Sequence, residues 1–387
     1  MPSQLAIKPD WLTPAIDILH AGEPLVVAVV VAPADHARLG ERALIRRDVS
    51  GWQVSGELAG AAQIPDTNLQ TIWSERCGQI LPIKLAVGSF NPQERTAQVL
   101  LAYHGPAERV WIFGAGHIAQ ALCPLAAQLG WTVTVCDDRS EYANAARFPK
   151  ADEILVTDFA LGAQRCSAGQ NNWAVLVTRG HQHDERILRQ LANNAPQYIG
   201  MIGSQRRVRS VRQRLSADGI PSGFLEAIHA PIGLPIGADS PGEIALSIAA
   251  ELVAVRRGAD PRTAASQHGA NSNVADTSGL LALWETVQGV MAGGRPVALA
   301  TVVDRRGSAP RGLGAQMAVF ADGGTVGTIG GGCGEETIKH AAKTLLVAEG
   351  SARLIEVDLT GDPASEIADV CGGRYTVFVE RLSPPTS

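Results

Sequence analysis

Short apolar runs alternate with amphipathic stretches through the middle of the chain. The runs predict buried strands, and they lie at residues 110–113, 132–135, 153–156, 174–178 and 198–204. The stretches between them predict helices, and the last one begins with a capping box at Ser240 and Glu243. Because strands that alternate with helices form a parallel sheet covered on both faces, we predict a doubly wound, Rossmann-like α/β domain over residues 106–257.

The hydrophobic patterns on either side of this domain repeat one another. The run EPLVVAVVV at residues 23–31 is matched by RPVALATVV at residues 295–303, and a Leu-Gly pair before a further apolar run follows each. The strand after Cys77-Gly78 is likewise expected to correspond to the strand after Cys371-Gly372. Such self-similarity indicates a duplicated module.

The chain therefore divides into four segments. Residues 1–105 and 279–387 are predicted to be two smaller α+β modules that flank the central domain, and residues 258–278 have the small, polar composition of a linker. The first copy is shorter and lacks the glycine-cysteine segment of the second. We interpret it as a degenerate copy that packs against its sibling as a pseudo-dimer.

Composition and charge narrow the classes of function. The formal net charge of −5 gives no indication of a nucleic-acid partner. No apolar run reaches the roughly 18–20 residues that a membrane span requires, and the first residues lack the apolar core of a signal peptide. The six cysteines are scattered, which favours reduced thiols and a cytoplasmic location.

A glycine turn ends the first predicted strand of the central domain. Gly114 allows the tight turn, Gly116 lets a phosphate approach the backbone, and the helix that follows offers N–H groups to an anion. Asp137 ends the next strand, where a dinucleotide-binding fold places the acid that holds a ribose hydroxyl. The spacing predicts a nucleotide-type site, and the alternative is a glycine turn kept only for tight packing.

Other polar residues follow strands of the same sheet and are expected at its carboxyl edge. His117 lies in the glycine turn, and His181 lies in the segment 178–184, TRGHQHD. The two histidines are candidate acid/base groups, although a metal site and surface histidines that cap a helix are alternatives. Gly203 and Ser204 begin a helix whose basic first turn is suited to a phosphate.

A triple glycine precedes a cysteine in the second module. Gly330, Gly331 and Gly332 free the backbone for close approach, and Cys333 begins a helix whose dipole favours a thiolate. Such a thiolate serves as a nucleophile or as a ligand to a soft metal. Arg311 is suited to a bidentate contact with an anionic oxygen. The alternative is a glycine-rich turn with a packed small thiol.

Several of these blocks, taken in order, resemble the XdhC/CoxI family of xanthine dehydrogenase accessory proteins. In the central domain the matching segments are 113–117, 136–139, 178–184, 198–204 and 232–237. In the second module they are 307–311, 314–317, 330–335 and 371–373. The family's usual order places one glycine-cysteine module before the Rossmann module, whereas here a degenerate copy holds that place.

The resemblance implies a maturation factor for a molybdenum enzyme. Such proteins hold a molybdopterin-type molybdenum cofactor, aid its sulfuration with a cysteine desulfurase, and deliver it to the apoprotein of a xanthine dehydrogenase-like molybdoenzyme. In this interpretation Cys333 contacts the metal or its sulfur, and Gly114, Gly116 and His117 line the nucleotide or phosphate cleft. Apart from the resemblance, the further residues that we expect to contact a cofactor are Asp137, Arg139, Gly203, Ser204, Arg311, Gly331 and Gly332. We also expect a homo-oligomer, in the simplest case a homodimer.

Two other functions remain open. An NAD(P)-dependent oxidoreductase would use the glycine turn and Asp137, with His117 or His181 as the acid/base group and Cys333 near the substrate. Asp137 would favour NAD over NADP, because a 2′-phosphate would meet a negative charge. The third function is an interaction subunit that binds a partner enzyme and no small ligand.

Overall fold

The computed structural model describes residues 9–32, 39–58, 64–75, 77–85, 95–106, 108–166, 171–257, 279–306, 311–330, 333–347, 351–358 and 373–384. The chain forms two compact units. The first combines residues 1–106 with 269–387, and the second comprises residues 107–268. The predicted linker, 258–278, lies outside the described residues. Within the described ranges no helix is long and apolar enough to cross a membrane.

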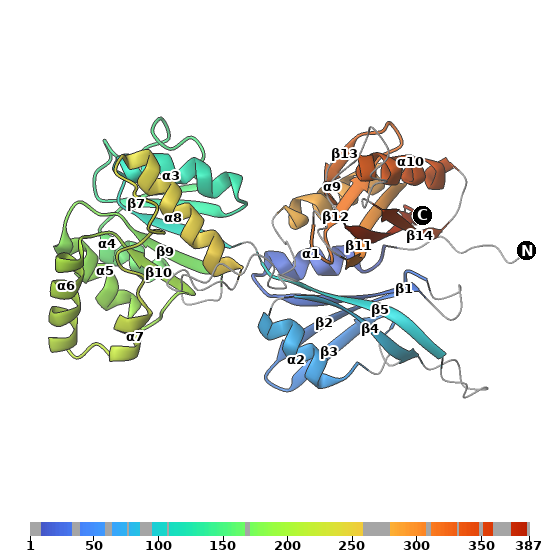
Figure 1. Cartoon of the computed structure of the whole chain (residues 1–387), viewed down its shortest axis with the longest axis horizontal. Helices are drawn as coiled ribbons and strands as arrows, with labels where there is room; N and C mark the ends of the chain where they lie inside the picture. The colour runs from blue at the N-terminus through green and yellow to red at the C-terminus, as the bar shows by residue number, and fades with distance from the viewer. Residues whose placement is uncertain are drawn as a thin grey trace, which may run out of the picture. The chain divides into compact units, whose positions relative to one another are not determined.

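The second unit contains a five-stranded parallel sheet (Figure 1). Its strands are β6 (Arg109–Phe113), β7 (Thr132–Asp137), β8 (Glu153–Val156), β9 (Asn172–Leu176) and β10 (Tyr198–Met201), in the spatial order β10-β9-β6-β7-β8. The chain builds outward from β6 to β8 and then returns to place β9 on the other side of β6. This reversal of direction is the switch point of a doubly wound fold, so the predicted Rossmann-like domain is confirmed.

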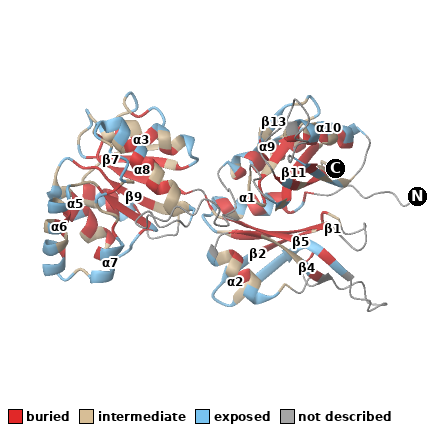
Figure 2. Ribbon diagram, viewed as in Figure 1, coloured by how far each residue is buried: buried red, intermediate tan, exposed pale blue. Residues whose placement is uncertain are grey.

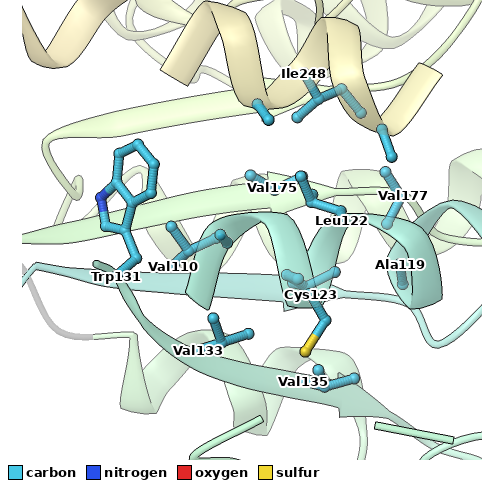
Figure 3. Close-up of a cluster of buried hydrophobic side chains, with 14 of the residues drawn as sticks. Val110, Ala119, Leu122, Cys123, Trp131, Val133, Val135, Val175, Val177 and Ile248 are labelled. Atoms are coloured by element: carbon cyan, nitrogen blue, oxygen red, sulfur yellow. The ribbon is translucent and has the colours of Figure 1, made fainter. Parts of the chain in front are cut away.

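Helices cover both faces of this sheet. They are α3 (His117–Gln128), α4 (Phe159–Arg165), α5 (His181–Leu191), α6 (Gln205–Ala217), α7 (Ser222–Ala227) and α8 (Pro241–Arg256). Successive residues of a strand point to opposite faces, so Val110 packs in one core and Trp111 in the other. Figure 3 shows the first core, in which Leu122 of α3 and Ile248 of α8 pack with side chains of the strands.

The first unit contains two modules of the same topology. One comprises α1 (Leu12–His20), β1 (Leu25–Ala32), β2 (Arg42–Asp48), β3 (Gly51–Gly56), α2 (Asp66–Glu75), β4 (Gly78–Leu85) and β5 (Arg95–His104). The other comprises α9 (Leu280–Ala292), β11 (Val297–Arg306), β12 (Gln316–Val319), β13 (Thr325–Gly327), α10 (Cys333–Val347), β14 (Ala352–Asp358) and β15 (Arg374–Leu382). Their antiparallel sheets run β3-β2-β1-β5-β4 and β13-β12-β11-β15-β14, which is the same order.

The two modules share the strand order that a duplication predicts, but one of the expected correspondences is wrong. The strand after Cys77-Gly78 is β4, at the edge of its sheet, and its counterpart is β14. The strand after position 372 is β15, the counterpart of β5. A Cys-Gly pair before an apolar run marks the start of a strand and carries no information about its neighbours, so the motif alone paired the wrong strands.

The two modules pack against each other through a shared core and a smaller cluster of strand residues. The ring of Trp11, before α1, meets that of Trp284, on α9, edge to face with centroids 5.2 Å apart. A second cluster joins strand residues of both modules, including Val31 and Phe378. Figure 2 shows that the buried residues follow the strands and the inner sides of the helices.

A buried ion pair also crosses this junction. The Arg42 guanidinium, on β2, pairs with the Glu380 carboxylate, on β15, and both side chains are at most 3% exposed. Arg42 also donates to the carbonyl of Gly40 at 3.0 Å, and its Cζ lies 4.5 Å from the centre of the Trp11 ring. Both charges are thus satisfied inside the protein.

Candidate functional site

The glycine turn after β6 is built by close backbone approach. Gly114 has φ +110°, and a Cβ at this position would lie 2.6 Å from the carbonyl oxygen of Val177, just after β9. Only glycine fits there, and the turn therefore lies against the end of the neighbouring strand. At Gly116 a Cβ would meet no atom within 4 Å, so the space over this residue is open.

Two helices begin after adjacent strands of the sheet, α3 after β6 and α5 after β9. α3 starts at His117 after Gly116, and α5 starts at His181 after Gly180; neither start has a side-chain cap. Their first-turn N–H groups and positive dipole ends favour an anion. Since β6 and β9 are adjacent parallel strands, the topology brings the two exposed candidate histidines to the same edge of the sheet.

Asp137 is directed into the protein. Its buried carboxylate accepts hydrogen bonds from the backbone N–H of Ala115 at 2.8 Å, the N–H of Arg139 at 3.1 Å, and Nε of Arg139 at 2.9 Å. The carboxylate therefore ties the glycine turn to the end of β7. As a ribose contact Asp137 stays a prediction, and so does Arg139 as a cofactor contact. In the structure both residues hold the glycine turn against the end of β7.

The next acid along the chain has the more accessible position. Asp138 accepts two hydrogen bonds from the Arg179 guanidinium, at 2.6 and 2.8 Å, and the two side chains are 32% and 38% exposed. The Arg179 hydrogen bonds lower the pKa of Asp138 well below its ordinary value. Sequence reasoning missed this pair, although each residue lies in a segment that resembles the family.

Asp184 is a buried anchor between two helices. It accepts from Oγ1 of Thr178 at 2.6 Å and forms an ion pair with Arg207 of α6. Burial raises the pKa of Asp184, and the Thr178 hydrogen bond and Arg207 act against that shift. Among the described residues no three His, Cys, Asp or Glu side chains are placed to hold a metal. The metal-site alternative at this edge therefore has no support in the geometry.

Gly203 and Ser204 lie at the end of β10, beyond β9 in the sheet order. Ser204 is the N-cap of α6, and its hydroxyl accepts from the backbone N–H of Arg207 at 3.3 Å. Unlike α3 and α5, this helix has its own side-chain cap. Its start is therefore less open to a ligand than the other two.

A buried carboxylate that sequence reasoning missed holds the loop before α8. Glu251 accepts from the Tyr198 hydroxyl at 2.8 Å and the Gly233 N–H at 2.5 Å, and it pairs with Nδ1 of His229 at 2.7 Å. Burial opposes ionisation, but these bonds outweigh it and hold the pKa of Glu251 below its ordinary value. The loop at residues 231–237 is therefore anchored to α8 by structural contacts.

The predicted thiol site of the second module is described only in part. Cys333 is the first residue of α10, but its side chain, Gly331 and Gly332 lie outside the described residues, as do residues 307–310 and 371–372. Arg311 is half-buried. Beneath the helix start, the buried Tyr375 hydroxyl has no hydrogen-bond partner in the described part of the chain and lies where a Cβ of Gly334 would be. Burial raises the pKa of Tyr375.

Comparison with known proteins links both units to one family. A family model described as the XdhC Rossmann domain matches residues 110–252. A second model, described as the XdhC and CoxI family, matches residues 290–358. Together the two matches cover more than half of the chain.

Individual relatives match over shorter stretches. A probable xanthine dehydrogenase subunit of Bacillus subtilis is 35% identical over 167 residues, 42% of this chain and 48% of the relative. The molybdenum cofactor insertion chaperone PaoD of Escherichia coli is 39% identical over 90 residues, 23% of this chain and 27% of the relative. This chain thus spans less than half the length of these relatives. A solved structure, described as a xanthine dehydrogenase from Bacillus halodurans, is 26% identical, with a TM-score of 0.46 over 63% of this chain and 66% of that one.

Proposed function

Because the chain belongs to the XdhC and CoxI family, we propose that it binds molybdenum cofactor and inserts it into a xanthine dehydrogenase-type apoenzyme. The observation that carries the proposal is that both family modules match one chain, in the two regions that hold the glycine turn and the glycine-cysteine segment. A relative named as a molybdenum cofactor insertion chaperone supports the same assignment.

The carboxyl edge of the parallel sheet fits the phosphate of a molybdopterin-type cofactor. Open space lies over Gly116, and the two uncapped helix starts offer backbone N–H groups to an anion. His117 and His181 are exposed at these starts, where an imidazole N–H can donate to a phosphate oxygen. In this proposal the two histidines bind the ligand, and neither needs to act as an acid or base.

The metal end of the cofactor is assigned to the second module. Cys333 begins a fifteen-residue helix, and a thiolate there is favoured by the helix dipole. A thiolate is also a suitable ligand for a soft metal-sulfur centre. The bound group would supply the redox centre of the client enzyme, while this chain binds it, shields it and releases it. A cysteine desulfurase, a homo-oligomeric state and a cytoplasmic location belong to the same proposal.

The orientation of Asp137 makes the oxidoreductase alternative weaker. In a dinucleotide-binding fold the acid after the second strand receives the ribose hydroxyls. Here that carboxylate is buried and accepts hydrogen bonds from Ala115 and Arg139. A ribose would have to displace these donors, whereas a phosphate at the helix starts would not. The geometry therefore favours an anion-binding role over nicotinamide chemistry.

Native mass spectrometry of the protein from a host that makes molybdenum cofactor tests the proposal. We expect a bound molybdopterin species that is lost in Cys333→Ala. Cys77→Ala is the matched control, because Cys77 is a buried cysteine of the first module, and it should keep the ligand. Wild-type protein should also restore activity to a cofactor-free xanthine dehydrogenase-type enzyme.

Two other outcomes would overturn the proposal. Bound NAD without any pterin, lost in Asp137→Ala, would establish the oxidoreductase function. The absence of any small ligand, together with tight binding to a partner enzyme, would leave the interaction function.

A further inference from the structure

We infer that Arg179 is the principal side-chain contact for a phosphate at the Rossmann edge, and that Asp138 holds it in place until the ligand arrives. The identity of the ligand rests on the proposed function. The position of the arginine rests on the described contacts alone.

The strand order places the Arg179–Asp138 pair across the glycine turn. Asp138 directly follows β7, and Arg179 lies three residues after β9. These strands lie on either side of β6, whose last residue, Phe113, is in register with Cys136 and Leu176. Because Asp138 follows β7 and Arg179 follows β9, the ion pair between them must pass over the end of β6. The end of β6 is where the uncapped start of α3 offers its first-turn N–H groups.

Two of the other arginines at this edge are committed to buried carboxylates. Arg139 donates to the buried Asp137 through Nε and Nη2, and Arg207 pairs with the buried Asp184. Removing either arginine from its partner would leave a carboxylate uncompensated inside the protein, which is strongly unfavourable. The hydrogen-bonded partner of Arg179, in contrast, is partly exposed, so water can solvate the Asp138 carboxylate when the arginine leaves. Nη1 of Arg179 also lies 3.7 Å from Oδ1 of the buried Asp137, but that carboxylate keeps its hydrogen bonds from Ala115 and Arg139 without it. Of these three arginines, Arg179 is therefore the one that can exchange partners at the lowest cost.

Asp138 is not left unpaired by such an exchange. Nε of Arg139 lies 3.8 Å from Oδ1 of Asp138, so a positive neighbour stays beside the carboxylate when Arg179 leaves. The fork of a guanidinium matches two oxygens of a phosphate as well as it matches a carboxylate. A ligand with a phosphate competes with Asp138 for this fork, whereas a neutral ligand does not. The pair thus selects for phosphate-bearing ligands.

Opposite effects of two substitutions test this exchange. Asp138→Asn should tighten binding by up to about fivefold, because it removes the competing ion pair. Arg179→Gln should weaken binding about ten- to a hundredfold, because it removes a charge-assisted contact to the ligand. Both are measured as Kd by equilibrium dialysis of the full chain. The probes are molybdenum cofactor released from a molybdoenzyme and inorganic pyrophosphate.

The double variant separates exchange from simple charge removal. Asp138→Asn should have no effect in the Arg179→Gln background, whereas the loss of a repelling charge alone would tighten binding in both backgrounds. Asp218→Asn is the matched control, because Asp218, at the C-terminal end of α6, accepts two bonds from Arg189 in the last turn of α5, and this pair is exposed. It should leave both Kd values unchanged.

The inference is overturned if Asp138→Asn and Arg179→Gln shift the Kd in the same direction, or if the Asp138→Asn effect persists without Arg179. The use of two probes distinguishes a failure of this inference from a failure of the proposed function. Cofactor bound equally by all variants supports the proposed function and refutes the exchange. The predicted pattern with pyrophosphate, and no cofactor bound by wild type, supports the exchange and refutes the proposed function.

Discussion

The two modules of the first unit share a strand order but differ at equivalent positions of their strands. Arg42 and Gln316 occupy the same register position opposite the central strand of each sheet, as do Ala102 and Glu380 on the other side. The Arg–Glu pair at the junction therefore forms between unlike modules, and the equivalent Gln316 and Ala102 have no opposite charges to pair. Gln316 instead accepts from the Trp284 indole at 2.8 Å.

This difference distinguishes the residues that maintain the fold of each module from the residues that determine how the two modules pair with each other. Small and branched apolar residues along β1 and β11 form the central strand of the same sheet topology in both modules. Many combinations of apolar residues can fill such a strand. The charged residues at the junction are specific to one copy each. The first module lacks the glycine-cysteine segment, yet it supplies half of a core that the second module shares. Its described contacts with the second module are those of a packing partner.

Loss of the junction arginine should have the largest effect on this shared core. Arg42→Ala leaves the Glu380 carboxylate buried and unpaired, so we expect the free energy of unfolding to fall by about 3–5 kcal/mol in urea titrations. The matched control is Asp358→Asn, which breaks the exposed Arg374–Asp358 pair on the same sheet as Glu380. It should cost no more than about 1 kcal/mol.

A double replacement sharpens the same comparison. Arg42→Met with Glu380→Leu removes both charges and should recover most of the stability, because apolar residues of similar volume satisfy a buried site. If Arg42→Ala costs no more than the surface control, the junction does not depend on this pair.

The pH dependence of stability should reveal a second difference between the two modules. His104 in the first module occupies the position of Leu382 in the second, and burial lowers its pKa from 6.5 to about 3. The unfolded chain therefore takes up a proton below pH 6.5 that the folded chain does not accept. Stability is complete above that pH and is lost progressively as the pH falls towards about 3.

His104→Leu should remove this dependence by making the first copy match the second. Between pH 7 and pH 5, we expect wild type to lose about 2 kcal/mol more unfolding free energy than the variant. Urea titrations across this pH range measure the difference. Parallel curves for the two proteins would show that His104 takes up its proton while folded.

The smallest effect is expected beneath the start of α10. Tyr375 stands where the first module has Ala97, and its buried hydroxyl has no partner among the residues that the structure describes. Tyr375→Phe removes that group, so the unfolding free energy should stay unchanged or rise by up to about 1 kcal/mol. Gly334→Ala should lower it by about 1–3 kcal/mol, and by less in the Tyr375→Phe background. A clear loss of stability in Tyr375→Phe would mean that the hydroxyl has a partner.

Local features of the central domain were predictable from the sequence. The strand expected at residues 110–113 is β6, Arg109–Phe113, and the capping box of Ser240 and Glu243 is present at the start of α8. An apolar run indicates a strand, and a capping residue indicates the start of a helix. Both signals depend only on residues that lie within a few positions of one another. The glycine turn belongs to the same class, since Gly114 needs a positive φ.

The pairing of charged residues at the site was not predictable in this way. Asp137 accepts a hydrogen bond from the backbone N–H of Ala115, 22 positions away, and its ribose contact stays a prediction. Arg179 reaches Asp138 across 41 positions, and Arg42 reaches Glu380 across 338.

The sequence by itself determined the elements, the duplication and the family, because all three are written in local periodicity and ordered motifs. Only the tertiary structure decided which acid is buried, which arginine is left beside water, and which module supplies each half of the junction. Those outcomes depend on strand order and on the burial of each charge, and neither is a property of residues that are neighbours along the chain.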